Sequence, residues 1–180
     1  MKKIYIILLI LLSSIAFAED EESPREKFLF VALDTGQMIK ALFSGGGYGV
    51  GGQVEFANFR YVGISVNVGY FNAGDSSYKV EVLGYGGGLV FYPEGYGPYG
   101  YYIKVGCMYN NGTESTNGVS MSGNLLTIPI NLGMKFVFDD LWGLTFDPYL
   151  EGEVYIGLDG VYKNVLTVRQ AIGFRCGFTF

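Results

Sequence analysis

Apolar and polar residues alternate along most of the chain after residue 27, and turn-forming residues separate the alternating segments. The last segment, residues 166–180, shows the pattern most fully. Its even-numbered residues are apolar except Gln170, and its odd-numbered residues are polar, small or charged. Successive side chains of a strand point to opposite faces, so this segment predicts a strand with one apolar and one polar face. Its length is unusual for a soluble sheet and typical of a tilted transmembrane strand with interfacial ends.

The alternation predicts eight strands, at residues 28–33, 45–56, 60–71, 78–92, 99–109, 124–138, 142–156 and 166–180. Short connections (57–59, 93–98 and 139–141) alternate with longer ones (34–44, 72–77, 110–123 and 157–164). Short turns at one end and longer polar loops at the other are typical of transmembrane barrels. We therefore predict an all-β fold, an eight-stranded antiparallel up-and-down transmembrane β-barrel.

Two neighbouring segments depart from the alternation. Residues 28–33 are almost all apolar, so the first strand has a poor period-two pattern. Residues 34–44 contain Met38, Ile39 and Ala41 followed by two more apolar residues. This composition favours a short helical turn or a bent strand over a polar loop.

Composition decides which face of the strands points outward. The chain is 49% hydrophobic and 16% charged, whereas globular domains carry about 25% charged residues. After the first twenty residues no apolar run approaches the roughly 18 residues that a transmembrane helix needs. A soluble barrel would place the polar face outside and charge it densely, but this face is mainly Gly, Ser, Thr and Asn. We therefore predict that the apolar face contacts lipid, with Trp142 at an interfacial turn.

The N-terminus has the features of a secretory signal peptide. Lys2 and Lys3 precede an apolar run, and Ala16-Phe17-Ala18 forms a small-residue cleavage site. We predict a signal peptide at residues 1–18, a flexible acidic leader at 19–27 and the barrel at 28–180. A membrane anchor is the alternative, but the apolar run is short for one.

The polar face carries acids and bases in similar numbers. In an eight-stranded barrel the interior is just wide enough for side chains to fill it, and buried charges need partners. We predict a closed lumenal network of ion pairs, in which Glu151 and Glu153 pair with Arg169 and Arg175, and a gated ion path is the alternative. The predicted members are Glu55, Lys79, Glu81, Lys104, Lys135, Asp147, Glu151, Glu153, Arg169 and Arg175.

The sequence lacks residues that several kinds of catalytic and binding site require. Histidine is absent, which removes the commonest catalytic base and metal ligand. We predict no enzymatic activity and no catalytic, cofactor-binding or metal-binding residues. The net charge of −5 is of the wrong sign for nucleic-acid binding. Cys107 and Cys176 fall on apolar faces of non-neighbouring strands and are predicted to face lipid as small hydrophobes, with a disulfide as the alternative.

The end of the chain resembles the C-terminal signal of outer-membrane β-barrels. The residues that carry the resemblance alternate and end on an aromatic residue: Ile172, Phe174, Cys176, Phe178 and Phe180. The chain as a whole is similar to the small outer-membrane barrel families of the OmpX, OmpA membrane-domain and OmpW type, through residues 127–136 and 147–152. The resemblance implies the bacterial outer membrane as location, its lipid as surroundings and the barrel-assembly machinery as a partner during insertion.

Barrels of these families differ in function, and the fold does not choose among the possibilities. Our first hypothesis is a structural or surface-interaction (adhesion-type) role, with residues 72–77 and 110–123 as loops that contact an extracellular partner. The alternative is a small pore or a conduit for small hydrophobic solutes, in which residues 34–44 would take part. Outer-membrane barrels that are enzymes resemble this chain in architecture but use a catalytic histidine.

Overall fold

The computed structural model describes residues 28–43, 46–57, 61–75, 77–95 and 97–180. The predicted signal peptide and leader, residues 1–27, lie outside the described residues. No helix in the described part of the chain is long and apolar enough to cross a membrane.

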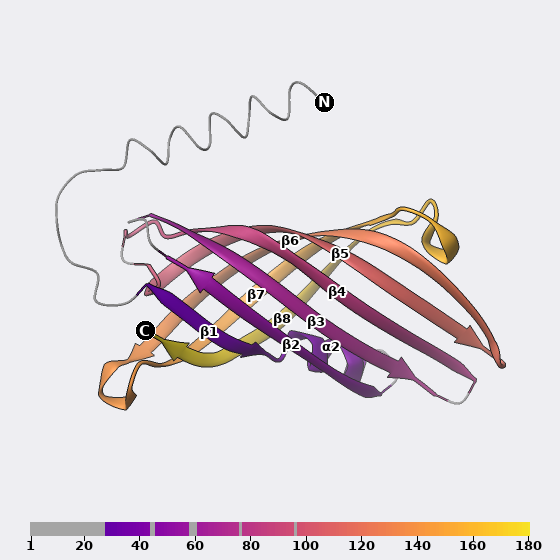
Figure 1. Cartoon of the computed structure of the whole chain (residues 1–180), viewed down its shortest axis with the longest axis horizontal. Helices are drawn as coiled ribbons and strands as arrows, with labels where there is room; N and C mark the ends of the chain where they lie inside the picture. The colour runs from indigo at the N-terminus through magenta and orange to yellow at the C-terminus, as the bar shows by residue number, and fades with distance from the viewer. Residues whose placement is uncertain (1–27, 44–45, 58–60, 76, 96) are drawn as a thin grey trace, which may run out of the picture.

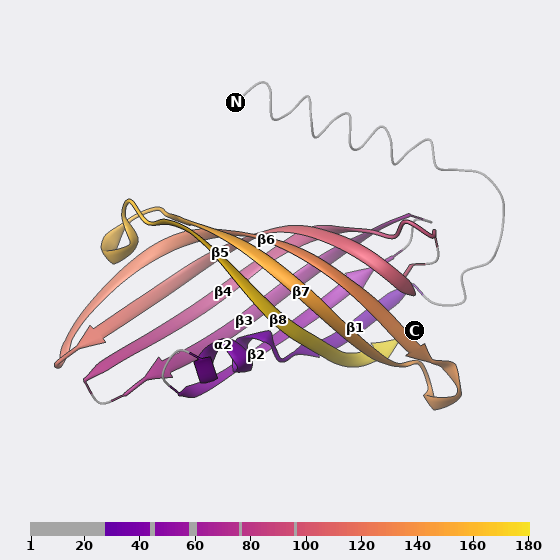
Figure 2. The same cartoon turned by 180° about the vertical axis from the view of Figure 1, so that it is seen from behind.

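Eight antiparallel strands pair in sequence order and close into a barrel (Figures 1 and 2). This arrangement confirms the predicted fold class. The strands are β1 (Leu29–Asp34), β2 (Gly47–Phe56), β3 (Val62–Gly74), β4 (Tyr78–Phe91), β5 (Gly100–Thr116), β6 (Val119–Phe138), β7 (Leu144–Gly157) and β8 (Leu166–Thr179). In the described residues, the α-helix α2 (Gly36–Phe43) lies between β1 and β2, and the short 3-10 helices η1 (Asp139–Leu141) and η2 (Gly160–Tyr162) flank β7.

The two ends of the barrel differ in their connections. The start of β1, the C-terminus and η1 lie at one end (Figure 1). The β3–β4 and β5–β6 hairpins and η2 lie at the other end, which we call the loop end. The short predicted connections therefore gather at one end and the longer ones at the other.

The outer face of the barrel is apolar, as predicted from the alternation. On β3, for example, Ile64, Val66 and Val68 are exposed, whereas the intervening Gly63 and Ser65 are buried. Trp142 follows η1 and is 88% exposed. The outward side chains thus form an apolar surface that a soluble protein would not leave uncovered.

Residues 110–123, predicted as the longest loop, are mostly strand instead. β5 continues to Thr116 and β6 begins at Val119. Only Asn117 and Gly118 form the turn, with φ of 50° and 82°, and two residues with positive φ are the signature of a type I′ hairpin turn. Hydroxyl groups of the two strands pair with each other, so the polar residues of this segment form a hairpin and not a loop. In the same way β3 extends to Gly74, which shortens the predicted loop at 72–77.

The segment after β1 forms a helix, in agreement with one of the two forms expected for residues 34–44. Pairing between β1 and β8 runs only from Phe30 to Asp34, and Thr35 adds hydrogen bonds to the backbone of Phe174 before α2 begins. α2 packs mainly against β2 and β3. The approach is close at Gly49, where any Cβ atom would collide with the backbone of Gln37.

Candidate functional site

The polar interior near the middle of the barrel is built around Arg175 of β8, which is 1% exposed. Its Nη1 donates to Asp147 Oδ2 at 2.9 Å and to the Tyr102 hydroxyl at 2.8 Å, and its Nε donates to Asp34 Oδ2 at 2.9 Å. Tyr102 donates to the other Asp147 oxygen at 2.8 Å, and Tyr149 donates to Asp34 at 2.6 Å. One guanidinium therefore holds two carboxylates and two tyrosines from three other strands, β1, β5 and β7.

A second cluster surrounds Lys135 of β6. Its ammonium lies 2.6 Å from Glu55 Oε2, and both side chains are fully buried. The ammonium also donates to the Tyr92 hydroxyl at 2.6 Å, and Tyr92 donates to Glu55. The ring centroid of Phe30 lies 4.4 Å from the ammonium, a cation–π distance. The Lys135 charge is thus enclosed by one acid and by aromatic rings.

A third group joins these clusters through amides. Lys104 of β5 donates to Gln53 at 2.7 Å and to Asn67 at 2.6 Å. Gln53 donates in turn to Glu55 at 2.9 Å, which links Lys104 to the Lys135 cluster. On the other side of the interior, Asn131 donates to Glu151 at 2.7 Å. The cavity beside this group measures only about 30 Å³.

The structure brings most, but not all, of the predicted network residues together. Those that lie inside are Glu55, Lys104, Lys135, Asp147, Glu151, Glu153 and Arg175. Arg169 is on the inner face of β8 but is exposed at the loop end, where its guanidinium lies 5.6 Å from the ring centroid of Tyr155. The expected pairing of Arg175 with Glu151 and Glu153 is wrong, because Asp34 and Asp147 take both sides of its guanidinium.

The predicted lumenal position of Lys79 and Glu81 is also wrong. They form an exposed 2.6 Å ion pair on the outer face, where Glu81 accepts a hydrogen bond from outward-facing Asn72. The phase of the alternation continues unbroken through the glycine-rich middle of β4. Outward Leu83 and Tyr85 therefore place Glu81 outside as well.

Several interior residues were missed by sequence reasoning. Asp34 was assigned to a connection, although it shares the inward parity of Phe30 and Ala32. Tyr92, Tyr102 and Tyr149 were not among the predicted members of the network, although the structure gives their hydroxyls hydrogen bonds to its carboxylates. Their even or odd position relative to the outward residues of the same strand was the signal that could have found them.

The two cysteines lie on the outer face, as predicted. Cys107 and Cys176 are exposed and free, so the alternative of a disulfide does not hold. Among the described residues, no group of three acidic, cysteine or histidine side chains is arranged to hold a metal ion.

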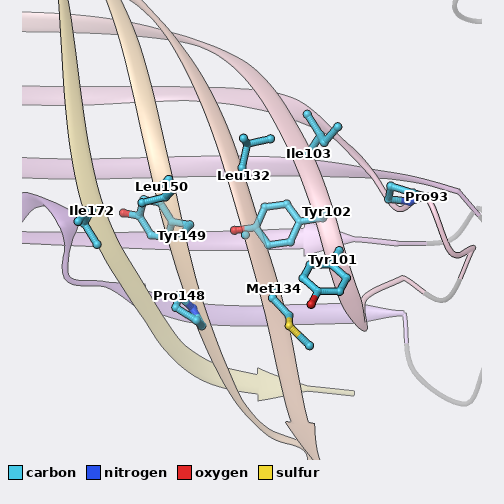
Figure 3. Close-up of a pocket in the computed structure, with 11 residues that line it drawn as sticks. Pro93, Tyr101, Tyr102, Ile103, Leu132, Met134, Pro148, Tyr149, Leu150 and Ile172 are labelled. Atoms are coloured by element: carbon cyan, nitrogen blue, oxygen red, sulfur yellow. The ribbon is translucent and has the colours of Figure 1, made fainter.

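The outer face also carries a shallow apolar groove of about 480 Å³ across β5 to β8. Figure 3 shows Ile103, Leu132, Leu150 and Ile172 along it, one from each strand. Behind the groove Tyr102 lies flat against the wall at Gly133, where a Cβ atom would collide with the ring. The groove is therefore part of the apolar outer surface, and Gly133 leaves room for the ring of Tyr102 on the inner side of the wall.

The crystal structure of the N-terminal β-barrel domain of Pseudomonas aeruginosa OprF superposes on this chain with a TM-score of 0.56. The superposition covers 87% of this chain and 98% of the OprF domain, at 14% sequence identity. The fold is that of an outer-membrane-type barrel. No protein-family model and no curated protein sequence matches the chain. At this identity the likeness extends to the fold, so function has to be argued from the residues themselves.

Proposed function

We propose that this protein is a non-enzymatic barrel of the bacterial outer membrane, with a structural or surface-interaction role and a lumen closed by its ion-paired interior. The observation that carries the proposal is the buried interior network. It draws side chains from all eight strands or the residues next to them, and it leaves a cavity of only about 30 Å³ beside it. The apolar exterior supports the membrane location.

Two properties support the proposed membrane location: the apolar area of the outer face and the hydrogen bonding of the strand backbone. Burial of apolar surface is favourable by about 25 cal/mol per Å², so the exposed Val, Leu, Ile and Phe side chains of every strand favour lipid over water. A closed barrel also satisfies its strand backbone internally, which a bilayer core demands. Outer-membrane lipid is then the surrounding medium, and the alternating C-terminal residues that end on Phe180 suit recognition by the barrel-assembly machinery.

Two properties support a closed lumen: the small size of the cavity beside the network and the pairing of the buried charges. A water molecule occupies about 30 Å³ in the liquid, so the cavity beside Lys104 and Glu151 accommodates about one water and no hydrated ion. The buried charges are also paired: Glu55 pairs with Lys135, and Asp147 and Asp34 both pair with Arg175. Opening a path would separate these buried pairs, and uncompensated buried charges cost about 3–5 kcal/mol.

Conductance in planar bilayers tests the closed lumen. We expect the refolded wild-type protein to be silent, because buried and paired side chains occupy the interior at the network. Glu55→Ala with Lys135→Ala removes a neutral pair and should introduce brief channel openings. The matched control is Lys79→Ala with Glu81→Ala, which removes an equally short pair from the outer face and should stay silent. Steady ohmic conductance of the wild type would refute the closed lumen and favour the pore or conduit.

The surface-interaction part of the proposal rests on the β5–β6 hairpin at the loop end (Figure 1). Hydroxyl pairs across its strands, Thr113 with Ser122 at 3.0 Å and Ser115 with Ser120 at 2.7 Å, make it a defined hairpin that could present a surface to an extracellular partner. Deletion of residues 113–116 and 119–122 would shorten it and keep the Asn117-Gly118 turn. The shortened protein should still fold, and cells that carry it should attach less to surfaces. Unchanged attachment would exclude the hairpin as the contact site.

A further inference from the structure

The loop end of the barrel holds a cavity of about 310 Å³ that the network does not fill. Its wall on β3 and β4 is apolar: Phe71 lies opposite Val82 and Ala73 opposite Val80 in the strand register. On the same stretch of β4 the charged side chains point outward. This part of the barrel is therefore apolar inside and charged outside, the reverse of the rest.

An apolar wall inside a polar lumen needs an explanation. Apolar surface that faces water in a concave site is typical of pockets that take a ligand with an apolar body. The volume is at the lower end of the range for small-molecule sites. Leu125 and Val165 extend the apolar lining toward β6 and β8.

Tyr162 of η2 adds an independent observation. The residue is 8% exposed and lines the cavity. It packs inward over Gly112 and Gly123, where a Cβ atom would collide with the ring. Its hydroxyl is buried and has no hydrogen-bond partner among the described residues. Nearly all buried polar groups in proteins are paired, so this hydroxyl is a position where a ligand polar group would be accepted.

The charges around the cavity indicate the sign of the ligand. Glu153 has the basic Arg169 directly opposite it in the strand register and accepts a hydrogen bond from Tyr155. Glu114 also lines the cavity, and no ion pair joins it to a basic side chain in the described part of the chain. The acid that remains without a base favours a cation.

Two tyrosines reinforce this preference. Glu114, Tyr78 and Tyr162 line the same cavity, and Glu114 acts electrostatically on the hydroxyl groups of both tyrosines. Burial, and then the charge of Glu114, raises the pKa of Tyr162 to about 12, so its hydroxyl stays neutral. A carboxylate beside tyrosine rings is a recurrent way to bind an organic ammonium group, because the rings add cation–π attraction.

We propose that the loop-end cavity binds a small apolar amine, with its ammonium at Glu114 and Tyr162 and its apolar body against Phe71, Val80 and Val82. The ammonium would donate to the Glu114 carboxylate and to the Tyr162 hydroxyl oxygen. The site lies on the loop side of the ion-paired network, so it does not depend on whether the lumen conducts.

Three probes with the same apolar body test the site: phenylbutylammonium, phenylbutanol and phenylbutyrate. They are titrated by calorimetry into the full-length protein in phosphatidylcholine nanodiscs, with empty nanodiscs as the blank. The amine should bind about tenfold or more tightly than the alcohol and the carboxylate, because a hydrogen-bonded charge pair is lost in the other two. Equal or tighter binding of the carboxylate, or no binding beyond the blank, would overturn the proposal.

Two variants locate the binding. Glu114→Gln should weaken the amine about tenfold and leave the alcohol unchanged, whereas Glu81→Gln on the outer face should change neither. Tyr162→Phe should weaken the amine without lowering the stability of the empty protein, since the hydroxyl has no partner to lose. If Glu114→Gln binds the amine as the wild type does, or Tyr162→Phe destabilises the empty barrel as a lost hydrogen bond would, the site is not at these residues.

Discussion

Arg175 offers the sharpest test of the interior network. Arg175→Met keeps most of the length of the side chain and removes its charge. The buried Asp147 carboxylate, which is 0% exposed, and the nearby Asp34 would then have lost their shared guanidinium. Breaking a buried pair by removing one partner costs about 3–5 kcal/mol, a large part of the 5–15 kcal/mol that holds most proteins folded.

The control is Arg169→Met, six positions earlier on the same strand and on the same face. Arg169 is exposed, contacts the ring of Tyr155 and lies opposite Glu153 in the strand register, without the short ion pairs that Arg175 makes. A cation–π contact at an exposed site contributes about 0.5–1 kcal/mol, so the free energy of unfolding should fall far less. Urea unfolding in lipid vesicles measures both, with Trp142, the single tryptophan, as the fluorescent probe.

A rescue variant separates lost charge pairing from general damage. In the Arg175→Met background, Asp147→Asn removes the uncompensated charge and keeps an acceptor for the Tyr102 hydroxyl. It should restore part of the lost stability, whereas in the wild type the same change should destabilise. If Arg175→Met and Arg169→Met differ by less than about 1 kcal/mol, or if Asp147→Asn makes the first variant worse, the network does not stabilise the barrel as described.

Three further expectations follow from other parts of the molecule. Deletion of Phe180, whose backbone pairs with β1, should reduce assembly into the outer membrane in cell fractionation, and normal assembly would count against the C-terminal signal. Val66→Arg on the outer face should cost about 2–4 kcal/mol of unfolding free energy in bilayers if the site lies near the midplane, whereas Val66→Leu should cost little; equal stability would contradict lipid contact. Hydrogen bonds from the Ser77 hydroxyl and backbone lower the pKa of Asp75 in the folded protein. Above the unfolded pKa of about 3.9 the carboxylate should therefore keep these hydrogen bonds and hold the turn in place. They should be lost as the pH falls through the lower, folded pKa. Amide NMR shifts of Ser77 would follow that loss, and a midpoint at or above the unfolded value would contradict it.

The sequence predicted the barrel well because period-two alternation determines which residues face outward. On β3 and β8 the outward residues are almost all large and apolar, so strand, face and order followed from the pattern. The interior partners were harder to predict. Arg175 was expected to pair with Glu151 or Glu153 of the neighbouring strand, but in the strand register it lies opposite Asp147 on β7 and opposite Asp34 on β1.

The wrong predictions concern residues that were placed by residue type instead of by their odd or even position along a strand. On β4 the apolar residues Val80 and Val82 were assigned to the outer face, and Lys79 and Glu81 were therefore assigned to the lumen. The paired hydroxyls of residues 110–123 were mistaken for a loop because small polar residues are common in both loops and exposed hairpins. Tyr162 could not be placed from the sequence at all, because its inward position depends on how η2 folds back over Gly112.

The short β1 strand gives the barrel a slanted mouth. Beyond Asp34 the chain coils into α2, whose eight residues advance about 12 Å as a helix but would span about 26 Å as a strand. β8 continues to Leu166 on one side of this segment, and β2 reaches only Gly47 on the other. The rim is therefore lower between β2 and β8, where α2 contacts both strands, than at the β3–β4 and β5–β6 hairpins.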